Sequence, residues 1–225
     1  RSLTLRYQKV KAIFKVQSAI AEGFRKAAKE MDCTEIFVPT IASGATEGGA
    51  EVFKIDYYGR DAFLTQSPQL YKQIMVGVFE RVWTISKAYR AEPSVTTRHL
   101  SEATQMDIEI GFIENFEELL DALEFVGTQM IKNASEKNKD ILVEFNVDMP
   151  LFSAKVPRLT LREAQGIVGK RTGRDLSKEL DLNPEDEKEI CEWAVDVHES
   201  DFVTITHFPT KKRAFYTLPD PKNPE

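Results

Sequence analysis

A strand–loop–strand pattern over residues 82–110 constrains the fold of this chain more than any other feature of its sequence. Residues 82–85 (Val-Trp-Thr-Ile) form an apolar run, and residues 106–110 (Met-Asp-Ile-Glu-Ile) alternate apolar and acidic side chains. Both patterns are typical of β-strands. The segment between them is small and polar and contains Pro93, which predicts a loop. The sequence therefore predicts a β-hairpin with a polar connection.

Charged and titratable side chains crowd the loop of this hairpin. They are Arg90, Glu92, Arg98, His99 and Glu102. A guanidinium is planar and permanently charged, and its fork of donors suits a phosphate or a carboxylate. An ionised glutamate only accepts hydrogen bonds, so it suits an amino or ammonium group. The pattern indicates a clamp for a polyanion, and the alternative is a solvated hairpin with surface ion pairs.

Composition narrows the class of protein. The net charge of −6 argues against an electrostatic coat for nucleic acid, although a basic patch on an acidic protein can still contact RNA. Cys33 and Cys191 fit no metal-ligand spacing, which indicates reduced thiols and a cytoplasmic location. No apolar run reaches the ~18 residues of a membrane span, and no signal-peptide pattern opens the chain. Both ends are typical of a fragment cut from a longer protein.

Apolar periodicity predicts helices between short strands. Residues 5–31 show one amphipathic pattern, in which Gly23 costs about 1 kcal/mol relative to alanine. A helix that begins at Asn115 is expected to bury a stripe made of Phe116, Leu119, Leu120, Leu123, Val126 and Met130. A capping box at residues 160–163 and an Asn183 cap predict two more helices.

Strands are expected at residues 36–39, 51–57, 61–65, 201–207 and 214–218. Ser67 and Pro68 are expected to open a helix whose Gln69 and Lys72 share one face. Helices between antiparallel hairpins predict an α+β fold rather than a doubly wound parallel sheet.

Two loops bear on ligand binding. Residues 43–50 are rich in glycine, which predicts either a flexible turn or a loop that closes over a ligand with Glu47 directed inward. The chain contains neither a P-loop nor a Gly-x-Gly-x-x-Gly motif, so neither device would hold a nucleotide here.

Four segments in register resemble the catalytic domain of class II aminoacyl-tRNA synthetases, most closely aspartyl-tRNA synthetases of the archaeal and eukaryotic type. The segments are residues 45–53 (Ala-Thr-Glu-Gly-Gly-Ala-Glu-Val-Phe), 66–73 (Gln-Ser-Pro-Gln-Leu-Tyr-Lys-Gln), 89–102 and 215–221. The resemblance implies one partial catalytic domain over residues 1–225. Its α+β fold would be an antiparallel sheet flanked by helices and incomplete at the C-terminus. Motif 1, about residues 10–40, would build a homodimer interface, and the hairpin of about residues 82–110 would be motif 2.

The resemblance implies that aspartate attacks the α-phosphate of ATP, and that the aspartyl group then passes to tRNA. Arg90 would be the catalytic residue, bridging the α-phosphate and the α-carboxylate of aspartate while charge builds up at phosphorus. Glu92 would accept from the adenine amino group or from the tRNA end. Arg98, His99 and Leu100 would bind ATP from the second strand.

The same resemblance assigns the amino-acid subsite. Glu47 would accept from the α-ammonium of aspartate, while Gln69 and Lys72 would bind its side-chain carboxylate. Because a neutral amide is a poor partner for a buried lysine, Lys72 favours aspartate over asparagine. The alternative for Lys72 is a surface lysine on an amphipathic helix.

The chain also departs from the family. Ala103 replaces the phenylalanine often found near the adenine, and His207 stands where similar enzymes often carry an acid. The family's remaining aspartate-contacting arginine, its Mg²⁺-binding acid, motif 3 and the anticodon-binding domain are not found, so we expect no metal ligands in this chain. We therefore expect little adenylation activity from it alone. Robust aspartate-dependent pyrophosphate exchange by the purified 225-residue chain would contradict that.

Three functions remain open. The first is an aspartate–tRNA ligase with aspartate, ATP and tRNA as partners, Mg²⁺ as cofactor and no membrane association. The second is an asparaginyl-tRNA synthetase, or a tRNA-independent asparagine synthetase derived from one. The third is a catalytically silent paralogue that binds or regulates a partner. The third is opposed by the full phosphate clamp, since a silent protein has no physical reason to keep Arg90, Glu92, Arg98 and His99.

Overall fold

A computed structural model describes residues 1–225 except 1–2, 45–50, 92–99, 152–154, 215 and 222–225. The chain forms two compact units, residues 1–147 and 148–225. The first unit contains η1 (Thr4–Arg6), α1 (Gln8–Glu30), β1 (Thr34–Glu35), β2 (Ile41–Ala42), β3 (Lys54–Tyr57), β4 (Arg60–Leu64), α2 (Gln69–Phe79), β5 (Arg81–Tyr89), β6 (Glu102–Ile110), α3 (Phe116–Lys137) and α4 (Lys139–Glu144). The second contains β7 (Arg158–Thr160), α5 (Leu161–Thr172), α6 (Pro184–His198), β8 (Thr204–Thr206) and η2 (Thr210–Lys212).

The predicted hairpin is confirmed as the β5–β6 pair. Its antiparallel register runs from Arg81 opposite Ile110 to Tyr89 opposite Glu102. β1 adds to β5 on the other side as a parallel strand, so the sheet order is β1-β5-β6. The α+β class is confirmed, although the sheet mixes parallel and antiparallel pairing.

The two faces of the hairpin differ in chemistry. Trp83, Ile85 and Ile108 pack against Phe24 of α1 and Val126 of α3 and form a hydrophobic core. Because side chains alternate along a strand, the residues between them point to the opposite face. That opposite face is polar and contacts α2. In residues 106–110, the apolar side chains thus face the hydrophobic core and the acidic side chains face α2.

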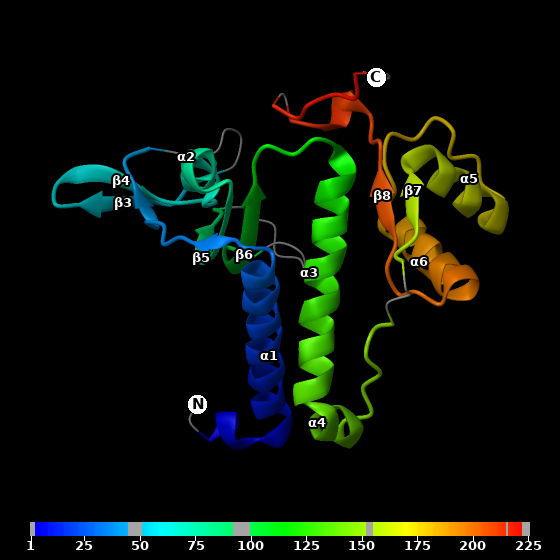
Figure 1. The fold of residues 1–225 in the computed structure, drawn as a ribbon, viewed down its shortest axis with the longest axis horizontal. Coiled ribbons are helices and arrows are strands. Elements are labelled where there is room, and N and C mark those ends of the chain that lie inside the picture. Colours follow the sequence, from blue (N-terminus) through cyan, green and yellow to red (C-terminus); the bar gives the residue numbers. More distant parts are fainter. Residues whose placement is uncertain (1–2, 45–50, 92–99, 152–154, 215, 222–225) are drawn as a thin grey trace. The chain divides into compact units, whose positions relative to one another are not determined.

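Helices α1 and α3 lie side by side over the apolar face (Figure 1). Their close approach depends on Gly23, because a Cβ there would lie 2.8 Å from Gln129 O and from Met130 Cα. From the sequence alone, Gly23 is predicted only to lower the stability of the helix. Its packing role requires knowledge of α3, which lies about a hundred residues further along the chain.

The remaining strands form two smaller sheets. β2, β4 and β3 form an antiparallel sheet in that order, which confirms the hairpin predicted over residues 51–65. In the second unit, β7 pairs with β8 in parallel, and α5 and α6 share a core that includes Val168 and Ile190. Both predicted caps are confirmed as capping boxes, formed by Thr160 with Glu163 and by Asn183 with Asp186.

Three predictions of elements were wrong. The strand expected at residues 36–39 ends instead at Glu35, although Ile36 still donates its N–H to Trp83 O at 2.9 Å. Among the described residues of 214–218 there is no strand. The stripe on α3 buries only Leu120 and Val126 fully, because α3 rests on α1 along one side and leaves Phe116, Leu119 and Leu123 exposed.

The sequence predicts no apolar run long enough to span a membrane. Among the helices of the described residues, none is both long enough and apolar enough to cross a membrane.

Candidate active site

The start of α2 is tied to the end of β5 through a short buried segment. Thr65, Gln66 and Ser67 are all buried, and Tyr89 of β5 donates its N–H to Thr65 O at 2.9 Å. The Ser67 hydroxyl accepts from Gln69 N at 3.0 Å, so it satisfies a backbone donor in the first turn of the helix. α2 begins at Gln69, one residue later than predicted. The first turns of α2 are therefore fixed over the polar face of the hairpin.

A buried lysine marks this face. Lys72 of α2 is only 4% exposed. Its Nζ lies 3.1 Å from Asp107 Oδ1 and 3.3 Å from Glu109 Oε2, both on β6. A cation removed from water requires charged partners, and two carboxylates supply them here. The prediction of a surface lysine is thereby excluded.

Gln69 joins the same cluster, which we call the α2–β6 cluster (Gln69, Lys72, Asp107 and Glu109). Its Nε2 donates to the Glu109 carboxylate, at 3.3 Å from Oε1 and 3.2 Å from Oε2. An ionised carboxylate has no donor, so it fixes which end of the amide faces it. The amide oxygen of Gln69 is consequently turned away from Glu109. The prediction that Gln69 and Lys72 share one helical face is confirmed, since both reach the same glutamate.

Two buried polar atoms on the hairpin have no hydrogen-bond partner among the described residues. They are Asp107 Oδ2 and Ser86 Oγ. Asp107 lies opposite Thr84 and Ser86 lies opposite Gln105, so both side chains fall on the polar face. Buried polar atoms are nearly always paired in native proteins. An unpaired acceptor beside a lysine is what a site for a substrate with a positive charge would offer.

Arg90 lies at the far end of the same face. Its N–H donates to Ser101 O at 3.1 Å, which continues the β5–β6 ladder by one step. Arg90 therefore follows the alternation of Thr84 and Ser86, and its side chain is exposed. Arg90 lies six residue steps beyond Thr84, which corresponds to about 20 Å along an extended strand. A ligand contacting both ends would have to extend along β5.

Not every predicted site residue can be placed. Gln69, Lys72, Arg90 and Leu100 are described, and Leu100 is exposed just before β6. The other predicted residues, Glu47, Glu92, Arg98 and His99, lie outside the described residues.

The sequence reasoning missed Asp107 and Glu109. The signal was present, because residues 106–110 alternate apolar and acidic side chains and so place both carboxylates on one face of a strand. An acidic face on a strand is usually solvent-exposed. Only the contact with Lys72, 35 residues away along the chain, distinguishes this pair from a solvated face.

The α2–β6 cluster does not provide a metal site by itself. No group of three or more His, Cys, Asp or Glu residues that could hold a metal ion occurs in the part of the chain that the structure describes. Asp107 and Glu109 already contact Lys72, whose positive charge would oppose Mg²⁺. No catalytic step is therefore assigned to a metal at this position.

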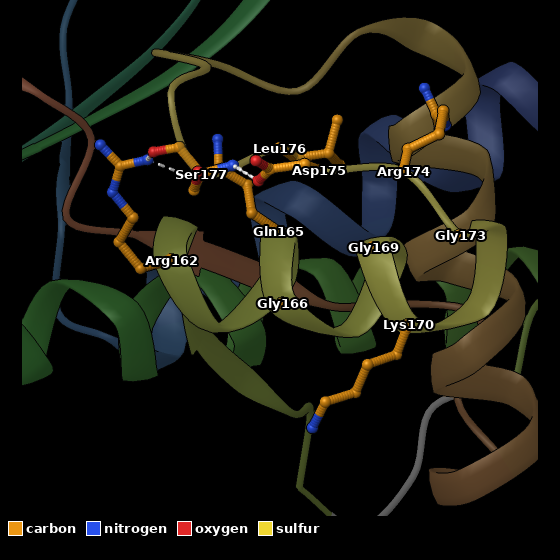
Figure 2. Close-up of a pocket in the computed structure, with 10 residues that line it drawn as sticks. All are labelled: Arg162, Gln165, Gly166, Gly169, Lys170, Gly173, Arg174, Asp175, Leu176 and Ser177. Atoms are coloured by element: carbon orange, nitrogen blue, oxygen red, sulfur yellow. Dashed lines mark hydrogen bonds between the residues drawn. The ribbon is translucent and has the colours of Figure 1, made fainter.

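A cavity of about 550 Å³ lies in the second unit, between α5 and residues 173–177. Figure 2 shows Arg162 and Gln165 directed toward Ser177, while Lys170 points to the opposite side of α5. Arg162 Nη1 donates to Ser177 O at 2.7 Å and to Gln165 Oε1 at 2.8 Å. Arg162 and Gln165 are thus engaged with each other and with the backbone of residues 177–179, to which Gln165 Nε2 also donates at 3.0 Å (Glu179 O). They support the loop that closes the cavity, and we assign no ligand to it.

Comparisons with known proteins agree with the geometry of the first unit. The family model described as tRNA synthetases class II (D, K and N) matches residues 1–225. The aspartate–tRNA(Asp/Asn) ligase of Thermus thermophilus is 40% identical over 220 residues, which cover 98% of this chain and 52% of that protein. The human cytoplasmic aspartate–tRNA ligase is 34% identical over 229 residues, which cover 100% of this chain and 46% of that protein.

Solved structures give the same result for the fold. The asparaginyl-tRNA synthetase from Pyrococcus horikoshii, complexed with asparaginyl-adenylate, superposes with a TM-score of 0.82 at 28% identity; the match covers 100% of this chain and 51% of that chain. The aspartyl-tRNA synthetase from Entamoeba histolytica gives a TM-score of 0.80 at 30% identity and covers 100% and 43% of the two chains.

The chain spans about half the length of the curated relatives it matches. A match over every residue nonetheless includes α2, both strands of the hairpin and the cluster between them. It follows that this chain belongs to the class II tRNA synthetases of the D, K and N group.

Proposed function

We propose that the protein containing this chain activates aspartate with ATP and transfers the aspartyl group to tRNA. The observation that carries the proposal is the buried Lys72 on the polar face of the motif 2 hairpin, with the unpaired Asp107 Oδ2 beside it. Several relatives that match nearly the whole chain are named aspartate–tRNA ligases, which supports the same reaction.

The charges of the cluster suit an amino acid with an acidic side chain. Lys72 offers a cation to the side-chain carboxylate, and Asp107 Oδ2 offers an acceptor to the α-ammonium group. Gln69 donates its amide nitrogen to Glu109, so the oxygen, which is turned away from Glu109, is better suited to the ammonium than to the carboxylate. The sequence predicts that Gln69 binds the side-chain carboxylate of aspartate. We propose instead that Gln69 binds the α-ammonium group.

The phosphate end of the substrate is assigned to the far end of the hairpin. Arg90 would neutralise charge at the α-phosphate, which is positioning and electrostatics rather than covalent catalysis. Glu47 remains the proposed partner of the ammonium group. Glu92, Arg98, His99 and Leu100 remain the proposed contacts of ATP or the tRNA end. ATP would enter with Mg²⁺, whose ligands are proposed to lie outside this chain.

Asparagine is the second candidate substrate. One solved structure with the same fold is an asparaginyl-tRNA synthetase with its adenylate. In addition, Lys72 is already paired with two carboxylates, so its charge alone does not exclude a neutral amide. The cluster carries one positive group, Lys72, and two negative groups. Discrimination between aspartate and asparagine therefore depends on the positions of these three groups around the substrate side chain.

Partners and location belong to the same proposal. A homodimer through motif 1, about residues 10–40, is supported by apolar residues that are exposed in this chain, namely Ile13, Phe14 and Phe37. tRNA is the proposed acceptor of the aspartyl group, and a cytoplasmic location is proposed because one relative is the human cytoplasmic ligase.

The test is isothermal titration with a non-hydrolysable aspartyl-adenylate analogue, with the asparaginyl analogue as control. We expect the aspartyl analogue to bind at least about tenfold more tightly, since a hydrogen bond to a charged group contributes about 1.5–3 kcal/mol. Stronger binding of the asparaginyl analogue would replace the proposed function with the second candidate. If this chain binds neither, the titration is repeated on the full-length protein, where failure to bind either analogue would reject both.

A further inference from the structure

Three basic residues follow one another on the surface of the second unit, in a chain whose net charge is −6. We call Lys211, Lys212 and Arg213 the basic triplet, and all three are exposed. Within the described residues, none of their side chains is paired with a carboxylate. Arg171 and Arg174 of the same unit, by contrast, are paired with acids of α6. The basic triplet therefore leaves an uncompensated positive charge on an acidic chain.

Hydrogen bonds of the backbone hold the basic triplet in a turn. Lys211 and Lys212 belong to η2, where Lys212 donates its N–H to Pro209 O at 3.0 Å. Arg213 directly follows η2 and donates its N–H to Thr210 O, also at 3.0 Å. Because the turn already fixes the backbone, a ligand that binds there has less conformational entropy to remove.

Side-chain contacts on both sides of the basic triplet add to this order. His207 Nε2 lies 3.7 Å from Asp220 Oδ2, so the chain before the triplet and the chain after it come together. The guanidinium carbon of Arg213 lies 4.0 Å from the centroid of the Phe208 ring. A guanidinium that rests on an aromatic face keeps its N–H donors at the rim. Those donors are therefore available to a phosphate.

The arrangement of the three cations fits an extended polyanion better than a small anion. A 3₁₀ helix turns about 120° per residue, so the side chains of Lys211 and Lys212 diverge rather than meet at one point. Lys and Arg contacts to successive phosphates supply the sequence-independent part of nucleic-acid binding. Tyr216, which is 75% exposed, follows shortly after the triplet and offers a ring on which an unpaired base can stack. Phosphates and bases together indicate RNA.

We propose that the basic triplet binds phosphates of tRNA. The inference rests on the proposed function, because that function supplies tRNA as the partner. The residues proposed above for aspartate and ATP all lie within residues 1–147, whereas the triplet lies in the second unit. The triplet contributes to the binding of tRNA through its backbone and takes no part in the activation of aspartate.

The test uses the full-length protein with Lys211→Gln and Lys212→Gln combined, and with Arg213→Gln alone. Aminoacylation of tRNA is compared with aspartate-dependent pyrophosphate exchange, which requires no tRNA. In the double variant, we expect KM for tRNA to rise about tenfold, while pyrophosphate exchange stays within about twofold of wild type. The slope of log Kd for tRNA against log salt concentration should become shallower by about one for each cation removed.

Lys178→Gln combined with Lys188→Gln is the matched control. Both lysines are exposed in the second unit, and the change in net charge equals that of the double variant. The control should leave KM for tRNA and the salt slope unchanged. If the triplet variants behave like this control, the inference is overturned while the proposed function stands. An equal fall in pyrophosphate exchange and aminoacylation would also overturn it, because the turn would then support activation rather than tRNA binding.

Two further outcomes separate the inference from its alternatives. Vesicles of phosphatidylglycerol test an anionic membrane surface as the partner. If the triplet variants lose binding to these vesicles but keep wild-type affinity for tRNA, the inference is overturned. If wild type shows no aspartate-dependent exchange, the proposed function fails, and a shallower salt slope of tRNA binding in the triplet variants would still support the tRNA contact.

Discussion

Two lysine–carboxylate clusters in the first unit share their chemistry and differ in their surroundings. In the α2–β6 cluster, Lys72 is 5% exposed in its side chain and its two carboxylates are 22% and 24% exposed. On α1 and α3, Lys137 lies 2.6 Å from Glu22, and the side chains are 49% and 39% exposed. The shorter contact is therefore the more solvated one.

The difference teaches that distance is a poor guide to the importance of an ion pair. Water and salt screen the exposed pair, and ordering two long side chains costs entropy. The buried cluster has lost much of its hydration, so removal of Lys72 would leave two carboxylates without a counter-charge. The exposed pair should therefore be dispensable, and the buried cluster should not be.

Lys72→Met should give the largest effect. It leaves two carboxylates facing each other in a partly buried site, which we expect to destabilise the protein by about 3 kcal/mol. Aspartate activation should fall about 100-fold in kcat/KM in the full-length protein, because the substrate carboxylate loses its charged donor. Pyrophosphate exchange and urea unfolding measure the two effects, and activity within threefold of wild type would remove Lys72 from the site.

Asp107→Asn should mainly weaken binding. The change keeps the side-chain volume and removes the charged acceptor whose Oδ2 has no partner among the described residues. We expect KM for aspartate to rise about tenfold or more with little change in KM for ATP. An unchanged KM for aspartate would show that the ammonium group is bound elsewhere.

Gly23→Ala tests the packing beneath the exposed cluster. The new Cβ would lie 2.8 Å from backbone atoms of α3, so α1 must move away. Overpacking of this kind costs about 1–3 kcal/mol, more than the helix propensity gained from alanine. Chemical denaturation measures the loss, and a variant more stable than wild type would mean that the helices can separate without strain.

Glu22→Gln should have the smallest effect. The side-chain hydrogen bond from Lys137 lowers the pKa of the Glu22 carboxyl group; desolvation opposes this shift and a hydrogen bond from Lys26 adds to it. A lowered folded-state pKa means that the pair contributes stability above the unfolded pKa and loses it as pH falls through the folded value. We expect a change in Tm of no more than about 2 °C at neutral pH, and this change should shrink as pH falls from the unfolded pKa through the lowered folded pKa. Thermal melts across pH check this, and a larger loss would give the exposed pair a structural role.

Local patterns predicted much of the fold because their causes lie within a few residues. The capping box at Thr160, the helix start at Asn183 and the shared face of Gln69 and Lys72 depend only on helix geometry. The β5–β6 hairpin follows from alternation on both sides of a polar loop.

Features that depend on distant contacts were not predictable in this way. The parallel pairing of β1 with β5 joins residues almost fifty positions apart, whereas the apolar run at residues 36–39 is a local pattern that predicts a strand two residues too late. The exposed Phe116 follows from the position of α1. The α2–β6 cluster likewise required α2 to lie over β6, so two acids that look solvated in the sequence become partners of a buried lysine.

The register of the β5–β6 hairpin implies a parity rule. Paired residue numbers sum to 191, so even positions of β5 and odd positions of β6 face α2, and the others face the hydrophobic core. In a mutational scan of residues 81–89 and 102–110, the loss of stability should therefore alternate from one residue to the next. Odd positions of β5 and even positions of β6 should show the larger losses, because they face the hydrophobic core. A single-residue insertion within β6 would exchange the roles of its faces, presenting Ile108 to α2 and Asp107 to the hydrophobic core.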